Sequence, residues 1–312
     1  MTVNRRDFAK GLGLSVAAVT MTSAAAKAAS PAIPVPPKGP WSRTGALQRS
    51  GGVLHYAVLG PDDGGAKPPI VLLHKLGGWL SDWRFVAPAL AEGRRVIAFD
   101  LPGHGGSRWS GEPPYLQTLG ETAATLVGAF DEMGFDQVDL VGTSLGGCLS
   151  VPLAAMWPEK VRRLALVSCA LGKHRTLQEI RDNVDAKQKD LYDRNGYPVP
   201  TPPELLTQIF GIVNTGPINA DGIESRKAAG RWIQPSERGV AFADIMGTLP
   251  RIQAPTLLVY GQFDKAYVKF RTDAEKALKS SRTEVIPDAG AFVMQDNPPA
   301  TAAVLRKFLN ET

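Results

Sequence analysis

One short stretch of the sequence has the residue types and spacing of a catalytic turn: Gly142-Thr143-Ser144-Leu145-Gly146. It stands between an apolar run that predicts a strand and a pattern that predicts a helix. Such a turn strains its central residue, and the flanking glycines let the strand and the helix approach closely. Ser144 is therefore expected to project above the sheet at a helix N-terminus, where the Leu145 amide can stabilise an oxyanion. This arrangement predicts nucleophilic attack by a serine hydroxyl on a carbonyl group.

The elements that position this turn follow from the hydrophobic pattern. Continuous apolar runs predict strands at 69–75, 94–100, 137–144, 161–170, 255–261 and 282–288, after a leading hairpin at 45–60. Helical patterns fall between them, at 79–93, 115–134, 145–160, 266–280 and 300–311. Alternating strands and helices predict an α/β fold with a mostly parallel, doubly wound sheet of eight strands.

The chain divides into five predicted segments. Residues 1–28 have the pattern of a signal peptide, and 29–43 form a proline-rich leader. The first part of the core is expected at 44–170 and the second part at 238–312. Between them, residues 171–237 are polar and interrupt the strand–helix rhythm, which predicts an inserted helical lid.

The first 28 residues predict an export signal. Arg5 and Arg6 precede a weakly apolar run, and small residues around Ala28 are typical of a cleavage site. The pattern resembles a twin-arginine signal, so we expect an exported protein, periplasmic or secreted. Alternatives are an uncleaved membrane anchor or a short amphipathic helix. No later run approaches the roughly 18 apolar residues of a membrane span, so no stable span is expected after cleavage.

Composition excludes several classes of function. The 312 residues are 44% hydrophobic and 21% charged, as in a soluble enzyme with a substantial core. The net charge of +5 is concentrated in the export segment, and no later basic cluster predicts a nucleic-acid partner. Cys148 and Cys169 are expected to be small buried hydrophobes rather than a redox pair.

Four landmarks along the chain resemble one family. In order they are "LLHKLGG", "FDLPGHGGS", "GTSLGG" and "LLVYGQFD". From about residue 44 to 312, the sequence is similar to α/β-hydrolases that carry a lid after the sixth strand. Members hydrolyse esters and related bonds through a Ser–Asp–His triad, without a cofactor.

The resemblance implies roles for individual residues. Leu76 would supply the second oxyanion amide beside that of Leu145, and Asp264 would be the triad acid. Lys75 departs from the family, which generally has glycine there. Its side chain would narrow the pocket, place a cation near an anionic substrate, or point into solvent.

Further side chains are candidates for substrate contact. We assign this role provisionally to four residues beside Lys75, namely His74, Trp79, His174 and Phe292. Structural roles compete for several of them. Histidines such as His74 and His104 usually support their loops in this family, and an aromatic residue at helical spacing favours core packing.

The triad base is absent from its expected position. A serine hydroxyl needs a neighbouring base to accept its proton. In the resembling family this is a histidine after the last strand, and "DAGAFVMQDNPP" has Ala291 there. Three explanations stay open: an engineered His→Ala replacement, a natural loss that leaves a binding protein, or a substitute base, for which His174 is the candidate. We favour the replacement, and expect Ala291 near Ser144 and Asp264 with an imidazole-sized gap between them.

The predicted parent activity is serine hydrolysis of a small-molecule carboxylic ester or lactone through an acyl-enzyme, with no cofactor or metal. In the present chain turnover should be nearly lost. The alternatives are a catalytically dead ligand-binding or sensor protein, since fold does not fix function, and a carbon–carbon bond hydrolase or perhydrolase. The oligomeric state is not indicated by the sequence.

Overall fold

The computed structural model describes residues 38–61 and 67–311. The predicted signal peptide at 1–28 and the leader as far as residue 37 lie outside the described residues. Export therefore stays a prediction. Among the described residues, no helix is long and apolar enough to cross a bilayer.

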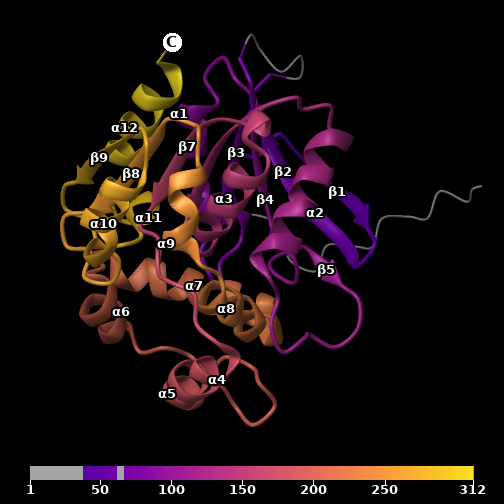
Figure 1. Ribbon diagram of the computed structural model, residues 1–312, viewed down its shortest axis with the longest axis vertical. Coiled ribbons are helices and arrows are strands. Elements are labelled where there is room, and N and C mark those ends of the chain that lie inside the picture. Colours follow the sequence, from indigo (N-terminus) through magenta and orange to yellow (C-terminus); the bar gives the residue numbers. More distant parts are fainter. Residues whose placement is uncertain (1–37, 62–66, 312) are drawn as a thin grey trace, which may run out of the picture. The chain divides into compact units, whose positions relative to one another are not determined.

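One large sheet forms the centre of the described fold (Figure 1). Its strands are β1 (Arg43–Arg49), β2 (Gly52–Leu59), β3 (Ile70–Leu73), β4 (Val96–Phe99), β5 (Arg108–Trp109), β6 (Val138–Thr143), β7 (Val161–Val167), β8 (Thr256–Gly261) and β9 (Ser281–Ile286). The order is β1-β2-β4-β3-β6-β7-β8-β9, with the two-residue β5 beside β2. The pairs β1–β2 and β2–β4 are antiparallel. The remaining neighbours in this order, from β4 and β3 to β9, are parallel. The predicted mostly parallel α/β sheet is confirmed.

The central strands are apolar because both faces of the sheet are covered. Every residue of β3, β4, β6 and β8 is buried. Along β3, Val71 and Leu73 belong to the core under one helical layer, and Ile70 and Leu72 to the core under the other. The first layer contains α2 (Leu119–Glu132), α3 (Leu145–Met156), α9 (Ile245–Thr248) and α10 (Arg271–Ala277). The second contains α1 (Ala87–Leu90), α11 (Val293–Asp296) and α12 (Pro298–Asn310).

The helix predicted at 79–93 is broken into two pieces. A 3₁₀ turn, η1 (Leu80–Trp83), is followed by the short α1. The Leu80 amide donates to the Asp100 carboxylate at 2.7 Å, so a tertiary contact fixes the start of the first piece. Pro88 stands in the first turn of α1, where its missing N–H is tolerated, and so begins a new helix.

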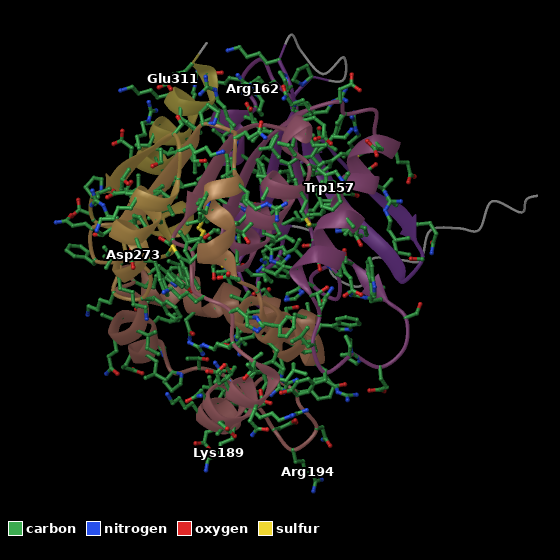
Figure 2. All side chains as sticks on the ribbon, in the orientation of Figure 1. Trp157, Arg162, Lys189, Arg194, Asp273 and Glu311 are labelled. Carbon is green, nitrogen blue, oxygen red and sulfur yellow. The ribbon has the colours of Figure 1, made fainter. Side chains whose placement is uncertain are left out.

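The lid region connects β7 to β8. It contains α4 (Leu177–Ile180), α5 (Ala186–Gln188), α6 (Pro203–Phe210), α7 (Thr215–Ala229) and α8 (Ile233–Phe242), and α8 continues past the predicted boundary at 237. Short helical turns complete the chain: η2 (Pro158–Lys160), η3 (Arg181–Asp185), η4 (Lys189–Leu191), η5 (Gly230–Trp232), η6 (Leu249–Arg251) and η7 (Val268–Phe270). Figure 2 places Lys189 and Arg194 of the lid at the end opposite Arg162 and Glu311.

Both cysteines are buried free thiols in the core between α3 and the sheet. Burial raises the pKa of the Cys148 thiol to about 12 and that of Cys169 well above its ordinary value. Thiols held in the protonated form are poor nucleophiles. The cysteines therefore have the packing role that the sequence predicted.

Candidate active site

The turn at 142–146, here called the elbow, has the strained geometry expected of a nucleophile. Ser144 has φ 48° and ψ −112°, outside the regions favoured by side-chain-bearing residues, and α3 begins at the next residue. A Cβ on Gly142 would lie 2.4 Å from the carbonyl carbon of Gly146, and one on Gly146 would lie 2.5 Å from the Leu73 oxygen. Both glycines are thus required by the close approach of β3, β6 and α3.

The loop at 74–78, here called the oxyanion loop, is joined directly to the elbow. The Gly146 amide donates to the His74 carbonyl at 3.0 Å. Within the described part of the chain, the amides of Leu76 and Leu145 have no hydrogen-bond acceptor. Gly77 has φ 65°, a left-handed conformation that favours glycine. Two unused N–H groups beside a serine hydroxyl are the donors that an oxyanion needs.

Asp264 follows β8 and has one carboxylate oxygen without a partner. Its Oδ1 accepts from the amides of Ala266 at 3.0 Å and Tyr267 at 2.9 Å. Its Oδ2 is buried and has no hydrogen-bond partner among the described residues. Burial raises the pKa of the Asp264 carboxyl, opposed by the Tyr267 amide, the nearby Ser168 hydroxyl and the Ala266 amide. A buried unpaired carboxylate oxygen calls for an explanation, and a triad histidine donating to it supplies one.

Tyr267, which sequence reasoning missed, contacts the nucleophile. Its hydroxyl lies 3.1 Å from Ser144 Oγ, and its own amide is bonded to Asp264. One residue therefore touches both Ser144 and Asp264, as a triad histidine does. Burial raises the pKa of the phenol, so it is a proton donor rather than a base. The available signal was its spacing, three residues after the acid.

Ala291 lies in the loop at 287–292, here called the base loop. It is fully buried, and its amide donates to the Phe210 carbonyl of the lid at 2.8 Å. The loop is joined to the acid by the Phe263 amide, which donates to Ala289 at 2.9 Å. The Tyr267 phenol borders the Ser144 hydroxyl, and the imidazole-sized gap expected between Ala291, Ser144 and Asp264 stays a prediction.

A cavity of about 520 Å³ opens beside the nucleophile. Its floor includes Lys75, Leu76, Gly77, Ser144, Tyr267 and Phe292. Its walls come from the lid, chiefly α6, α7 and the segment at 188–201. The structure thus brings together four residues predicted from the sequence, namely Lys75, Leu76, Ser144 and Phe292. Asp264 and Ala291 do not line the cavity.

Lys75 forms a buried ion pair, which excludes the prediction that it points into solvent. Its Nζ lies 2.6 Å from Asp82 Oδ1, and also 5.3 Å from the centre of the Phe292 ring. Burial raises the pKa of Asp82, opposed by the Lys75 charge. The Lys75 side chain therefore narrows the pocket, and its charge is neutralised by Asp82.

His74 and His104 support the oxyanion loop rather than the cavity. His74 Nε2 accepts from the Leu101 amide at 2.9 Å, so its Nδ1 donates to the Lys75 carbonyl at 2.7 Å. The two rings are 5.2 Å apart, and burial lowers the pKa of His74 to about 4 and that of His104 to about 3. The assignment of His74 to substrate contact is therefore corrected: it is a neutral, buried scaffold.

Trp79 and His174 also lie away from the cavity. Trp79 is buried, with Lys38 Nζ 5.4 Å from its ring centre. His174 is exposed, and its Nδ1 donates to the Phe242 carbonyl. Its ring faces a separate groove that includes Pro152. Neither residue lines the cavity that contains Ser144, which corrects their assignment to substrate contact and speaks against His174 as a substitute base.

Within residues 38–61 and 67–311, no group of three or more His, Cys, Asp or Glu side chains is arranged to hold a metal ion.

The fold and the elbow define the class of protein. Residues 68–210 match the family model described as alpha/beta hydrolase fold. With the sheet order above, this shows that the chain has the α/β-hydrolase fold.

Comparison with known proteins gives a range of relatives. The chain is 30% identical over 79% of its length to the dihydrolipoyllysine-residue acetyltransferase component of the acetoin cleaving system from Pseudomonas putida, of which it spans 64%. It is 40% identical to 2-hydroxy-6-oxo-2,4-heptadienoate hydrolase from Pseudomonas putida, over 40% of the chain and 44% of that protein. The crystal structure of the enol-lactonase from Burkholderia xenovorans LB400 has a TM-score of 0.68 and 24% identity, covering 86% of this chain and 100% of that one. This last similarity shows the shared fold.

Proposed function

We propose that this protein is a serine hydrolase for carboxylic esters or lactones whose turnover is limited by the alanine at position 291. The observation that carries the proposal is the intact half of the site. Ser144 is strained into a nucleophile turn, faces the cavity, and lies beside the oxyanion loop, whose Leu76 amide has no acceptor among the described residues.

The orphaned Asp264 Oδ2 supports the same reading. A histidine at position 291 would come from the loop that is hydrogen-bonded to Phe263, next to the acid. Its imidazole would accept the Ser144 proton while donating to Asp264. Attack on the carbonyl would then form a tetrahedral intermediate whose oxyanion accepts from Leu76 and Leu145, and collapse would give the acyl-enzyme.

The test is the Ala291→His variant, assayed on a panel of esters and lactones. Loss of the base removes most of a rate factor on the order of 10⁶, while roughly 10³–10⁴ over water survives through the oxyanion hole and binding. The variant should therefore hydrolyse its best substrate roughly 10²–10³ times faster than the parent chain. The proposal is overturned if the folded variant still binds esters but stays inert, both alone and when Tyr267 is also replaced by valine to free the Ser144 hydroxyl.

A natural ligand-binding protein is the second candidate, and Tyr267 favours it. Its phenol gives Ser144 a hydrogen-bond partner that cannot accept the serine proton. If binding is the function, Ala291→His stays inert even when Tyr267 is also replaced by valine to make room for the imidazole. Activity that appears in the double variant, but not in Ala291→His, would instead show that the phenol blocks a hydrolase site.

Product analysis on the restored enzyme separates ester hydrolysis from carbon–carbon cleavage, the activity named in one relative. The export prediction is tested separately. Expression of the full chain with its paired arginines, or with both replaced by lysine, should send only the former out of the cytoplasm.

A further inference from the structure

Arg226 is a lid cation that faces the cavity. It lies on α7 and is half-buried. A Cβ built on Gly77 would lie 3.0 Å from its Cγ and 3.3 Å from its Nη1. The guanidinium is thus packed against the oxyanion loop, one residue away from Leu76. The Leu76 amide is one of the two proposed oxyanion donors, so the guanidinium borders the loop that would hold the substrate carbonyl.

Among the described residues, Arg226 forms no ion pair with a carboxylate; its Nε is buried without a hydrogen-bond partner, and its neighbour is the neutral Tyr192 hydroxyl. Two other buried cations are neutralised within the described fold, Arg94 by Asp139 and Lys75 by Asp82. Buried cations are normally paired because desolvation of an isolated charge is unfavourable. An arginine in a cavity wall without a carboxylate partner therefore points to an anion supplied from outside the chain.

Glu237 is the carboxyl group in the same cavity, and it is already engaged. It accepts from Gln188, and from the Tyr192 hydroxyl at 3.3 Å. Burial raises the pKa of Glu237, and the charge of Arg226 opposes this shift. No ion pair joins this carboxyl to the arginine among the described residues, because its oxygens are engaged by Gln188 and Tyr192.

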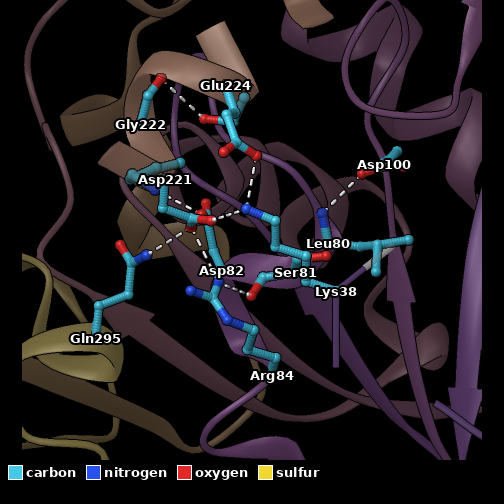
Figure 3. A network of polar contacts seen from close by, with 12 residues as sticks. Lys38, Leu80, Ser81, Asp82, Arg84, Asp100, Asp221, Gly222, Glu224 and Gln295 are labelled. Atoms are coloured by element: carbon cyan, nitrogen blue, oxygen red, sulfur yellow. Dashed lines mark hydrogen bonds and ion pairs between the residues drawn. The ribbon is translucent and has the colours of Figure 1, made fainter. Parts of the chain in front are cut away.

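The helix that carries Arg226 is anchored by the polar contacts of Asp221 (Figure 3). Asp221, five residues earlier on α7, accepts from Arg84 at 2.9 Å and from Gln295 at 3.2 Å, and Lys38 Nζ lies 3.5 Å from it. Arg84 directly follows η1, so the contact joins the lid to the segment after the oxyanion loop. The guanidinium is therefore positioned before any ligand arrives, which reduces the entropy lost on binding.

We infer that the substrate carries a carboxylate close to its ester or lactone carbonyl, and that Arg226 binds it. The planar guanidinium fork matches two carboxylate oxygens, and such charge-assisted pairs are among the stronger hydrogen bonds. The inference rests on the proposed function for the placement of the carbonyl, and goes beyond it by naming an anionic class of substrate.

The parent chain is a convenient reagent for the test because it should bind esters while turning them over slowly. Calorimetry would compare monomethyl succinate, which carries a carboxylate, with dimethyl succinate, which does not. We expect the monoester to bind about tenfold more tightly, or better. R226Q should abolish this preference by weakening the binding of the monoester, not that of the diester. R226K should retain part of the preference. R231Q, an arginine outside the cavity that pairs with Glu112, is the matched control and should leave the preference intact.

Equal affinity for the two esters, failure of both to bind, or a preference that survives in folded R226Q would overturn the inference. The thermal melts of the three variants establish that they are folded. Failure of the proposed function gives a different pattern. If Ala291→His is inert but the parent prefers the monoester through Arg226, the anion site stands without the hydrolase. If Ala291→His hydrolyses the diester as well as the monoester, the hydrolase stands without the anion site.

Discussion

The elbow and the base loop meet at the same site but are built in opposite ways. The elbow keeps a serine at positive φ, two glycines that admit no side chain, and an adjacent pair of unused amides. The base loop presents a fully buried alanine packed among apolar residues. Backbone strain is unfavourable and persists where the surrounding structure enforces it. The elbow that positions the nucleophile is therefore retained, although the base loop offers no side chain that can accept the serine proton.

The largest expected effect tests whether the elbow and the base loop act in the same reaction. In the Ala291→His background, Ser144→Ala should remove the whole roughly 10²–10³-fold gain in hydrolysis, because the base then has no hydroxyl to activate. The same serine change in the parent should alter the rate far less. Steady-state kinetics on a single ester checks both, and a gain that survives without Ser144 would separate the two regions.

The next prediction concerns the rigidity of the elbow. Gly146→Ala should lower the free energy of unfolding by about 3 kcal/mol, because its Cβ would fall 2.5 Å from the Leu73 backbone oxygen. Gly128→Ala is the matched control on α2, where a Cβ meets nothing within 4 Å. That variant should be neutral, or more stable by up to about 1 kcal/mol. Denaturant unfolding of both proteins measures the difference.

Acid should weaken the scaffold behind the oxyanion loop. The pKa values of His74 and His104 are lowered from 6.5 to about 4 and about 3, so the unfolded chain takes up protons first as the pH falls. Their contribution to stability is complete above pH 6.5 and is lost progressively down to pH 4 and pH 3. The slope should approach about 1.4 kcal/mol per pH unit for each histidine. In His104→Gln, the slope of the free energy of unfolding against pH across this range should be about half that of the parent chain.

The smallest expected effect concerns Tyr267. Tyr267→Phe removes the 3.1 Å contact with Ser144 and should change the free energy of unfolding by about 1 kcal/mol. Tyr197→Phe, at a side chain that is half exposed on the lid, should be neutral. A loss several times larger in Tyr267→Phe would mean that the phenol holds the elbow together, rather than only bordering it.

Local pattern predicted the elbow and the sheet because their causes are local. Continuous apolar runs follow from burial on both faces, and the glycines at 142 and 146 from the approach of neighbouring backbone. Tyr267 and Arg226 were missed because each reaches the site only after distant segments fold together. The ion pair of Lys75 with Asp82 was missed for the same reason. His174 was wrongly considered as a base because nearness to the end of a strand does not say which side of the lid a ring faces.

The Asp221 contacts have a consequence for how the site opens. Because one carboxylate joins α7 to Arg84 beyond the oxyanion loop and to Gln295 beyond the base loop, the roof of the cavity is not released without disturbing both segments below it. Amide hydrogens of α7 and of residues 80–84 should therefore exchange with solvent through a shared opening event of similar free energy. Substrate entry and the integrity of the oxyanion donors are then two readouts of a single local unfolding equilibrium.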